Sequence, residues 1–136
     1  DGMKNVLETA AAMEKKRLIV LFGCGGDRDR SKRSAMAALA EKYADYSIVS
    51  NDNPRSEDPE KIFTDIKAGF SNHFNDFEII ADREKAIRQA VKMAAKDDLV
   101  LLLGRGHEKY QILKNHKIEL DDRKVAYQAA EEVKGI

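Results

Sequence analysis

Three polar segments carry most of the residues in this chain that could bind or transform a ligand. Each follows a short apolar run: "GCGGDRDRSKR" spans 23–33, "SNDNPRSED" spans 50–58 and "GRGHEKYQ" spans 104–111. Glycine lets a backbone approach a ligand closely, while arginine and lysine bind carboxylates and phosphates. In an open α/β sheet the ligand crevice lies beyond the carboxyl ends of the strands. If the apolar runs are parallel strands, the three segments converge on one site.

The first segment has the charge of an anion site at the start of a helix. It contains four cations, Arg28, Arg30, Lys32 and Arg33. A helix N-terminus favours anions, so basic side chains there indicate a bound phosphate or carboxylate. The segment is not a P-loop, because Ser31 and Arg33 flank Lys32 where that pattern requires glycine and then serine or threonine. A solvated basic turn, neutralised by Asp27 and Asp29, is the alternative interpretation.

The second segment has the groups needed to hold the head of an amino acid. Pro54 fixes its own φ and pushes Asn53 toward an extended backbone, which stiffens the loop. Asp52 or Asn53 can contact an ammonium group, and the fork of Arg55 matches a carboxylate with two parallel hydrogen bonds. From this segment alone, an ordinary turn leading to a helix cap at Asp58 explains the residues nearly as well.

The third segment adds a candidate amine ligand and a candidate base. It opens at Gly104, and it contains Glu108, which could bind an amine. His107 could accept a proton, although a lone histidine is more often a structural hydrogen-bonding residue. The histidines lack metal-ligand spacing, and Cys24 has no companion at zinc-binding spacing, so we expect no metal site.

The composition argues against several classes of partner. The 136 residues include 24 basic and 24 acidic ones, so no overall field attracts nucleic acid or an anionic membrane. No apolar run approaches the length of about 20 residues that spans a bilayer. A single cysteine excludes an internal disulfide and fits a reducing compartment. We therefore expect a soluble cytoplasmic domain.

Short apolar runs alternate with segments of helical period, and this alternation predicts an α/β fold. The strand candidates are 18–22, 47–49, 77–80 and 99–103, and the helix candidates are 3–15, 36–43, 62–70, 87–94 and 122–133. Segments 110–113 and 117–119 are candidates for a final hairpin or edge strand. We predict one domain over 1–136, with a doubly wound, mostly parallel Rossmann-like sheet and helices on both faces.

Two helix starts are marked by local residue pairs. Asp58 before Pro59 is typical of a helix cap followed by proline at the first helical position. Asp82 is a second candidate cap, for a helix that begins at Arg83.

Four motifs together resemble one known family. "FGCGGDRDRSKR", "DNPRSEDP", "DREKAI" and "GRGHEKYQ", in this order and spacing, resemble the C-terminal domain of the MurE-type Mur ligases. The likeness covers practically the whole chain, and "DGMKNVLETA" looks like the start of that domain. The resemblance implies a Rossmann-like last domain, with the UDP-sugar domain and the central ATPase domain absent from this chain.

The resemblance also implies an activity. In this family ATP, bound with Mg²⁺ mainly by the central domain, phosphorylates the carboxylate of UDP-N-acetylmuramoyl-L-alanyl-D-glutamate. The amine of a diamino acid then attacks the acyl phosphate, a step of peptidoglycan synthesis that serves cell shape and division. We expect meso-diaminopimelate or a close analogue such as meso-lanthionine as that amino acid. We expect the domain alone to be inactive.

Residue roles follow from the same resemblance. The positions that match the amino-acid site are Arg28, Asp52, Asn53, Arg55, Gly104 and Glu108. Arg55 would face the distal carboxylate of the side chain, which lysine lacks. Lys32 and Arg33 would approach the nucleotide phosphates. Ser31 departs from the glycine expected in that position, which affects the phosphate side more than the amino-acid side.

Two other classes of function fit part of the pattern. One is a free-standing module that binds an amino acid or nucleotide without catalysis. The other is the same domain of a lysine-adding or folylpolyglutamate-type ligase, in which we do not expect the "DNPR" motif. No residue is assigned as a general base, and His107 and Glu108 are the candidates to assist deprotonation of the amine.

Overall fold

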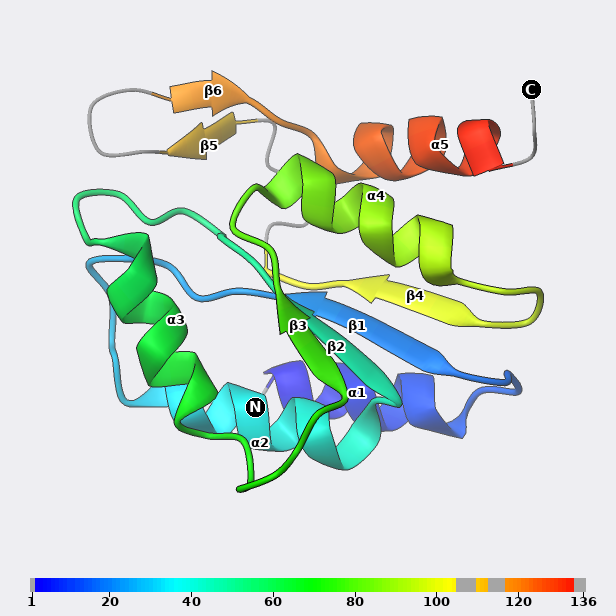
Figure 1. The fold of residues 1–136 in the computed structure, drawn as a ribbon, viewed down its shortest axis with the longest axis horizontal. Helices are drawn as coiled ribbons and strands as arrows, with labels where there is room; N and C mark the ends of the chain where they lie inside the picture. Colours follow the sequence, from blue (N-terminus) through cyan, green and yellow to red (C-terminus); the bar gives the residue numbers. More distant parts are fainter. Residues whose placement is uncertain (1, 105–109, 113–116, 134–136) are drawn as a thin grey trace.

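A parallel four-stranded sheet forms the centre of the domain (Figure 1). The computed structural model describes residues 2–104, 110–112 and 117–133. The strands are β1 (Leu18–Phe22), β2 (Tyr46–Val49), β3 (Phe77–Ile79) and β4 (Leu99–Leu102). Their order is β3-β2-β1-β4, so β1 lies between β2 and β4. The chain therefore winds outward from β1 in both directions, as the sequence predicts.

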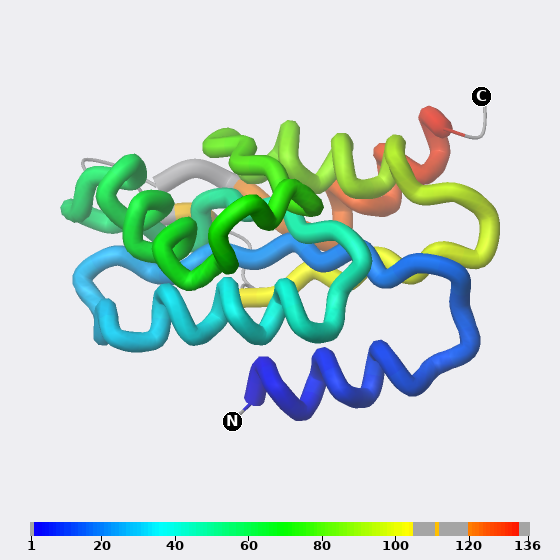
Figure 2. The backbone as a smooth tube through the Cα atoms, turned by 60° about the horizontal axis from the view of Figure 1, so that its bottom comes forward, coloured from blue at the N-terminus to red at the C-terminus, as the bar shows by residue number. Residues whose placement is uncertain are grey.

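Helices cover both faces of this sheet. The helices are α1 (Gly2–Ala12), α2 (Lys32–Tyr43), α3 (Pro59–Lys67), α4 (Arg83–Met93) and α5 (Asp122–Val133). Figure 2 shows α1 and α2 on one side of the sheet and α4 and α5 on the other. Two short strands, β5 (Tyr110–Ile112) and β6 (Lys117–Glu119), pair as a separate antiparallel hairpin. The doubly wound prediction is confirmed.

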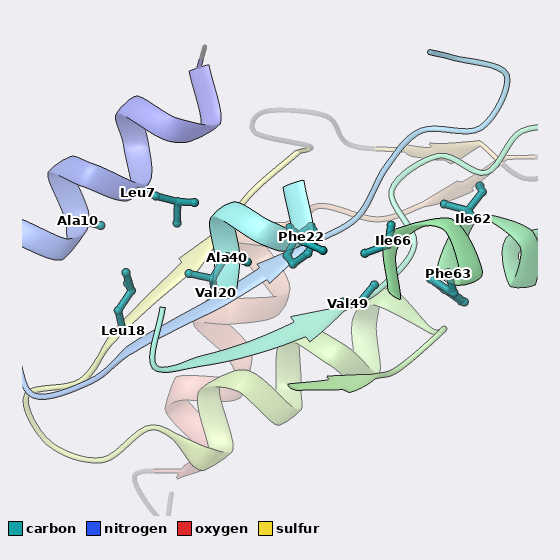
Figure 3. Close-up of a cluster of buried hydrophobic side chains, with 11 residues drawn as sticks. Leu7, Ala10, Leu18, Val20, Phe22, Ala40, Val49, Ile62, Phe63 and Ile66 are labelled. Atoms are coloured by element: carbon teal, nitrogen blue, oxygen red, sulfur yellow. The ribbon is translucent and has the colours of Figure 1, made fainter. Parts of the chain in front are cut away.

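The core consists of two apolar clusters, one on each face of the sheet. All five residues of β1 are fully buried, and alternate side chains point to opposite faces. Val20 and Phe22 pack with α1, α2 and α3 (Figure 3), whereas Ile19 and Leu21 pack with α4 and α5. Because both faces of β1 are covered, its sequence is continuously apolar rather than alternating.

Both expected helix caps are present. The side chain of Asp58 accepts a hydrogen bond from the backbone N–H of Glu60 at 3.0 Å, with Pro59 opening α3. Asp82 accepts from the N–H of Lys85 at 3.0 Å at the start of α4. These contacts satisfy N–H groups that a helix start leaves without partners.

The predicted third helix is too long at its C-terminal end. It was expected to reach Phe70, but α3 ends at Lys67. Phe70 instead stacks on Phe77 of β3, with ring centroids 4.3 Å apart, and also on Phe74. The three half-buried rings thus form one stacked cluster beside the sheet edge.

Candidate functional site

The three polar segments meet at the carboxyl ends of β1, β2 and β4. Ser50 N–H donates to the carbonyl of Phe22 at 3.0 Å, which joins the first two segments. Gly104, with a φ of 106°, lies beside Asp52, and a methyl group on it would be 3.0 Å from an Asp52 carboxylate oxygen. The segment after β1 therefore lies between the other two, as the strand order requires.

The glycine-rich segment and the "DNPR" segment contact each other through their backbones. Gly26 N–H donates to the carbonyl of Asn53 at 2.8 Å. A methyl group on Gly26 would lie 1.8 Å from the carbonyl oxygen of Pro54, so no larger residue fits at this position. Asn53 is 3% exposed, and its packing supports the expectation that this loop is stiff.

Side chains extend this contact on the outer side. The backbone N–H and the hydroxyl of Ser56 donate to the Asp27 carboxylate at 3.1 and 2.7 Å. Asp27 N–H in turn donates to Glu57 at 3.1 Å. The two hydrogen bonds from Ser56 hold the pKa of Asp27 below its ordinary value. The ionised Asp27 carboxylate thereby links the first segment to the second.

Two arginines flank Gly25 at the entrance of the site. Arg55 has a left-handed backbone with a φ of 53°, and its guanidinium donates to the carbonyls of Gly26 at 3.1 Å and Asn53 at 3.3 Å. A methyl group on Gly25 would lie 2.9 Å from a guanidinium nitrogen of Arg55 and 3.3 Å from the Cγ atom of Arg28. Arg28 is exposed, and its guanidinium makes no ion pair with any of the described residues. The Arg55 guanidinium and the base of the Arg28 side chain therefore both lie next to Gly25.

The side chain of Arg33 is buried and paired with two carboxylates of the domain. Its side chain is 1% exposed, and its guanidinium pairs with Glu57 at 2.7 Å and Asp65 at 2.8 Å. The hydrogen bonds from Arg33 lower the pKa of Glu57 to about 2. Lys32 remains exposed. Successive helix residues point about 100° apart, so Lys32 and Arg33 face different sides of α2. Arg33 therefore holds α2, α3 and the second segment together, and we assign it no phosphate contact.

Two further residues support the site, and sequence reasoning gave neither of them this role. Gln111 of β5 is 5% exposed, and its side-chain amide donates to the carbonyl of Asp52 at 2.8 Å. Arg83 is 1% exposed and donates to the carbonyls of Asn51 and Leu103, at 2.9 and 3.0 Å. Gln111 stands at the end of "GRGHEKYQ", so a polar residue between two large apolar ones was the available signal.

Cys24 lies inside the glycine-rich segment but is not poised for nucleophilic chemistry. Its sulfur is 3.4 Å from the sulfur of Met36. Burial raises the pKa of the Cys24 thiol to about 11, so the thiol stays protonated at neutral pH.

Two residues of the expected site, His107 and Glu108, lie outside the described residues. Within the described ranges, no group of three or more histidine, cysteine, aspartate or glutamate side chains could hold a metal ion. Nor is any helix among them both long and apolar enough to cross a bilayer.

The fold and the strand-end loops define a Rossmann-like α/β domain with charged side chains gathered at the carboxyl ends of its strands. Residues 1–106 match the family described as Mur ligase, glutamate ligase domain, and the chain belongs to this family. The resemblance seen in the four motifs is thereby confirmed.

The chain is similar to UDP-N-acetylmuramoyl-L-alanyl-D-glutamate--2,6-diaminopimelate ligases. The protein of that name from Syntrophomonas wolfei is 51% identical over 127 residues, which cover 93% of this chain and 26% of the relative. The one from Geobacillus kaustophilus is 49% identical over 132 residues, covering 97% and 27%. A solved structure with this title matches with a TM-score of 0.91 and 38% identity, covering 97% and 27%. The chain thus spans about a quarter of the length of these relatives.

Proposed function

We propose that this chain is the amino-acid-binding C-terminal domain of an ATP-dependent ligase that adds meso-diaminopimelate to UDP-N-acetylmuramoyl-L-alanyl-D-glutamate. The observation that carries this proposal is that the Arg55 guanidinium and the Arg28 side chain both lie next to Gly25, in the segments that also bring Asp52 beside Gly104. The relatives bearing this ligase name are about four times as long as the chain, which favours a ligase domain over a free-standing binding module.

The ligand chemistry matches these groups. Diaminopimelate carries an ammonium and a carboxylate at each end, so it needs two cationic and two anionic or polar partners. Arg28 and Arg55 supply the forks for the carboxylates, while Asp52 and Glu108 hold the ammonium groups, with Asn53 and Gly104 shaping the loops between them. Lysine lacks the distal carboxylate, so it would leave the charge of Arg55 without a counter-charge in a closed site, and this disfavours lysine.

The domain contributes to the reaction mainly by positioning. ATP activates the dipeptide carboxylate as an acyl phosphate, and this domain presents the attacking amine and closes over the nucleotide. Holding the amine near the acyl phosphate can contribute about 7 kcal/mol or more of the barrier lowering. Exposed Lys32 is placed to approach the nucleotide phosphates, while the Mg²⁺ and most of the ATP belong to the central domain. His107 is the candidate to accept the amine proton. We place the reaction in the cytoplasm, where ATP is available.

A substrate comparison in the full-length ligase tests this function. Phosphate release is measured with the UDP-sugar dipeptide, ATP and one of three amino acids: meso-diaminopimelate, meso-lanthionine or L-lysine. We expect diaminopimelate to be used with a kcat/KM at least 100-fold above that of lysine, because one unpaired buried charge costs about 3 kcal/mol. Equal use of lysine, or no diaminopimelate-dependent release, would overturn the proposal.

A further inference from the structure

Arg83 joins two of the site segments through their backbones. It is the first residue of α4, and its side chain is almost fully buried. One guanidinium nitrogen donates to the carbonyl of Asn51 at 2.9 Å, just before Asp52. The other donates to the carbonyl of Leu103 at 3.0 Å, just before Gly104. Arg83 therefore contacts the residues immediately preceding two parts of the amino-acid site.

The strand order explains why such a bridge matters. β2 and β4 are not neighbours, because β1 lies between them (Figure 1). Sheet hydrogen bonds fix each of these strands to β1, but none joins β2 directly to β4. Their ends stand about 10 Å apart, twice the spacing of adjacent strands. The planar fork of Arg83 spans the two ends and so sets the separation of the segments that follow them.

Asp122 holds Arg83 in this position. The Nε of Arg83 lies 3.1 Å from one Asp122 carboxylate oxygen, and Nη2 lies 2.7 Å from the other. Asp122 is the first residue of α5 and is 3% exposed. A cation at the start of α4 is opposed by the dipole of that helix, whereas a carboxylate is favoured by both helix starts. Asp122 thus offsets the charge of Arg83 and anchors α5 at the site edge.

Stability alone does not explain this pair. A buried ion pair is on average no more stabilising than two apolar residues of the same size. Apolar residues, however, cannot donate to two carbonyls that end separate strands. We propose that Arg83 and Asp122 form a positioning pair that sets the distance between Asp52 and Gly104, and hence the affinity for the diamino acid. This inference rests on the proposed function for its substrate.

The kinetic test uses Arg83→Lys and Asp122→Asn in the full-length ligase. Lysine keeps the charge, but its single nitrogen cannot occupy the positions of the three guanidinium nitrogens that contact the two carbonyls and Asp122. We expect the KM for diaminopimelate to rise at least tenfold, while the KM for ATP and for the UDP-sugar dipeptide stays within twofold. Arg88→Lys is the matched control, because Arg88 lies on the same helix in exposed pairs with Glu84 and Glu132. This control should leave all three KM values unchanged.

A purely structural role predicts a different result. Partial unfolding lowers the active fraction, and therefore kcat, without a selective change in one KM. Circular dichroism and thermal melting establish which variants fold. If Arg83→Lys does not fold, Asp122→Asn is measured in its place. A folded variant of either residue with an unchanged KM for diaminopimelate overturns the inference.

A spectroscopic test is independent of catalysis. In the ¹⁵N-labelled 136-residue chain, Arg83→Lys should shift the amide resonances of Asp52, Asn53 and Gly104, and Arg88→Lys should not. Unmoved amides in the Arg83 variant also overturn the inference. If wild-type ligase releases no phosphate with diaminopimelate, the proposed function fails, while this comparison still decides the positioning role.

Discussion

Arg55 has an unusual backbone conformation, and its guanidinium lies against the glycine-rich segment. A left-handed φ of 53° is uncommon for a residue with a side chain, and such positions concentrate at functional sites. Its fork bonds to the carbonyls of Gly26 and Asn53. Backbone carbonyls are weaker partners for a cation than a carboxylate is, so a ligand carboxylate can take over these hydrogen bonds.

Removing the Arg55 side chain should therefore affect one substrate far more than another. For Arg55→Ala we expect kcat/KM for diaminopimelate to fall by about 10- to 100-fold, because a hydrogen bond to a charged group contributes about 1.5 to 3 kcal/mol. Lysine use should rise, because the variant has no arginine charge that lysine leaves without a counter-charge. Arg30→Ala is the control, since Arg30 is an exposed neighbour paired with Asp65. Phosphate release with each amino acid measures both, and unchanged selectivity in the Arg55 variant would contradict the assigned role.

At the scale of elements, the site depends on two loops packed at backbone distance. The N–H of Gly26 and the carbonyl of Asn53 form a hydrogen bond between them, and the carbonyl of Pro54 occupies the space of a side chain on Gly26. The loops of parallel strands have no ladder of their own, so this contact and the Asp27–Ser56 hydrogen bonds fix their relative position.

A single methyl group should disrupt this packing. Gly26→Ala places a carbon 1.8 Å from the Pro54 carbonyl oxygen, so one loop must move. We expect the free energy of unfolding to fall by about 1 to 3 kcal/mol, as in other overpacked sites. Gly2→Ala is the control, because a methyl there meets nothing within 4 Å. Urea denaturation measures both variants. A Gly26→Ala midpoint equal to that of wild type would show that the loops are not held at this distance.

Local patterns in the sequence predict the elements, whereas partners distant in the chain decide the site. The Asp58–Pro59 helix start and the apolar run of β1 are legible from adjacent residues, and the structure confirms both. The resemblance implies that Arg33 approaches a nucleotide phosphate, whereas in the structure it pairs with Glu57, 24 residues away. The partner of Arg83 lies 39 residues away, so no local pattern could reveal it.

At the scale of the whole molecule, Arg33 links the stability of the domain to pH. Glu57 lies in the second segment, Asp65 lies on α3, and both accept hydrogen bonds from Arg33 of α2. Because these hydrogen bonds lower the pKa of Glu57 to about 2 from its ordinary value of 4.5, the folded state favours the ionised carboxylate. The resulting stability is fully present above about pH 4.5 and is lost as the pH falls toward 2.

Acid denaturation should report this linkage. For wild type we expect the free energy of unfolding to decline between pH 4.5 and 2, and for Glu57→Gln we expect a smaller decline over the same interval. The variant is less stable at neutral pH, because it loses the ion pair with Arg33. Glu8→Gln, on the exposed surface of α1, is the control and should follow wild type. Parallel curves for wild type and Glu57→Gln would refute the linkage. Urea titrations at each pH provide the measurement.

The pairing around Arg33 also changes the electrostatic character of the site entrance. The four cations of the first segment share their surroundings with four carboxylates, Asp27, Asp29, Glu57 and Asp65. Such a neutral surface generates little long-range electrostatic potential, and salt at physiological strength screens the remaining potential at distances beyond about 8 Å. An amino acid without net charge would not be attracted by such a potential in any case. Diffusion brings the amino acid to this entrance unaided, and selection between amino acids takes place only at contact.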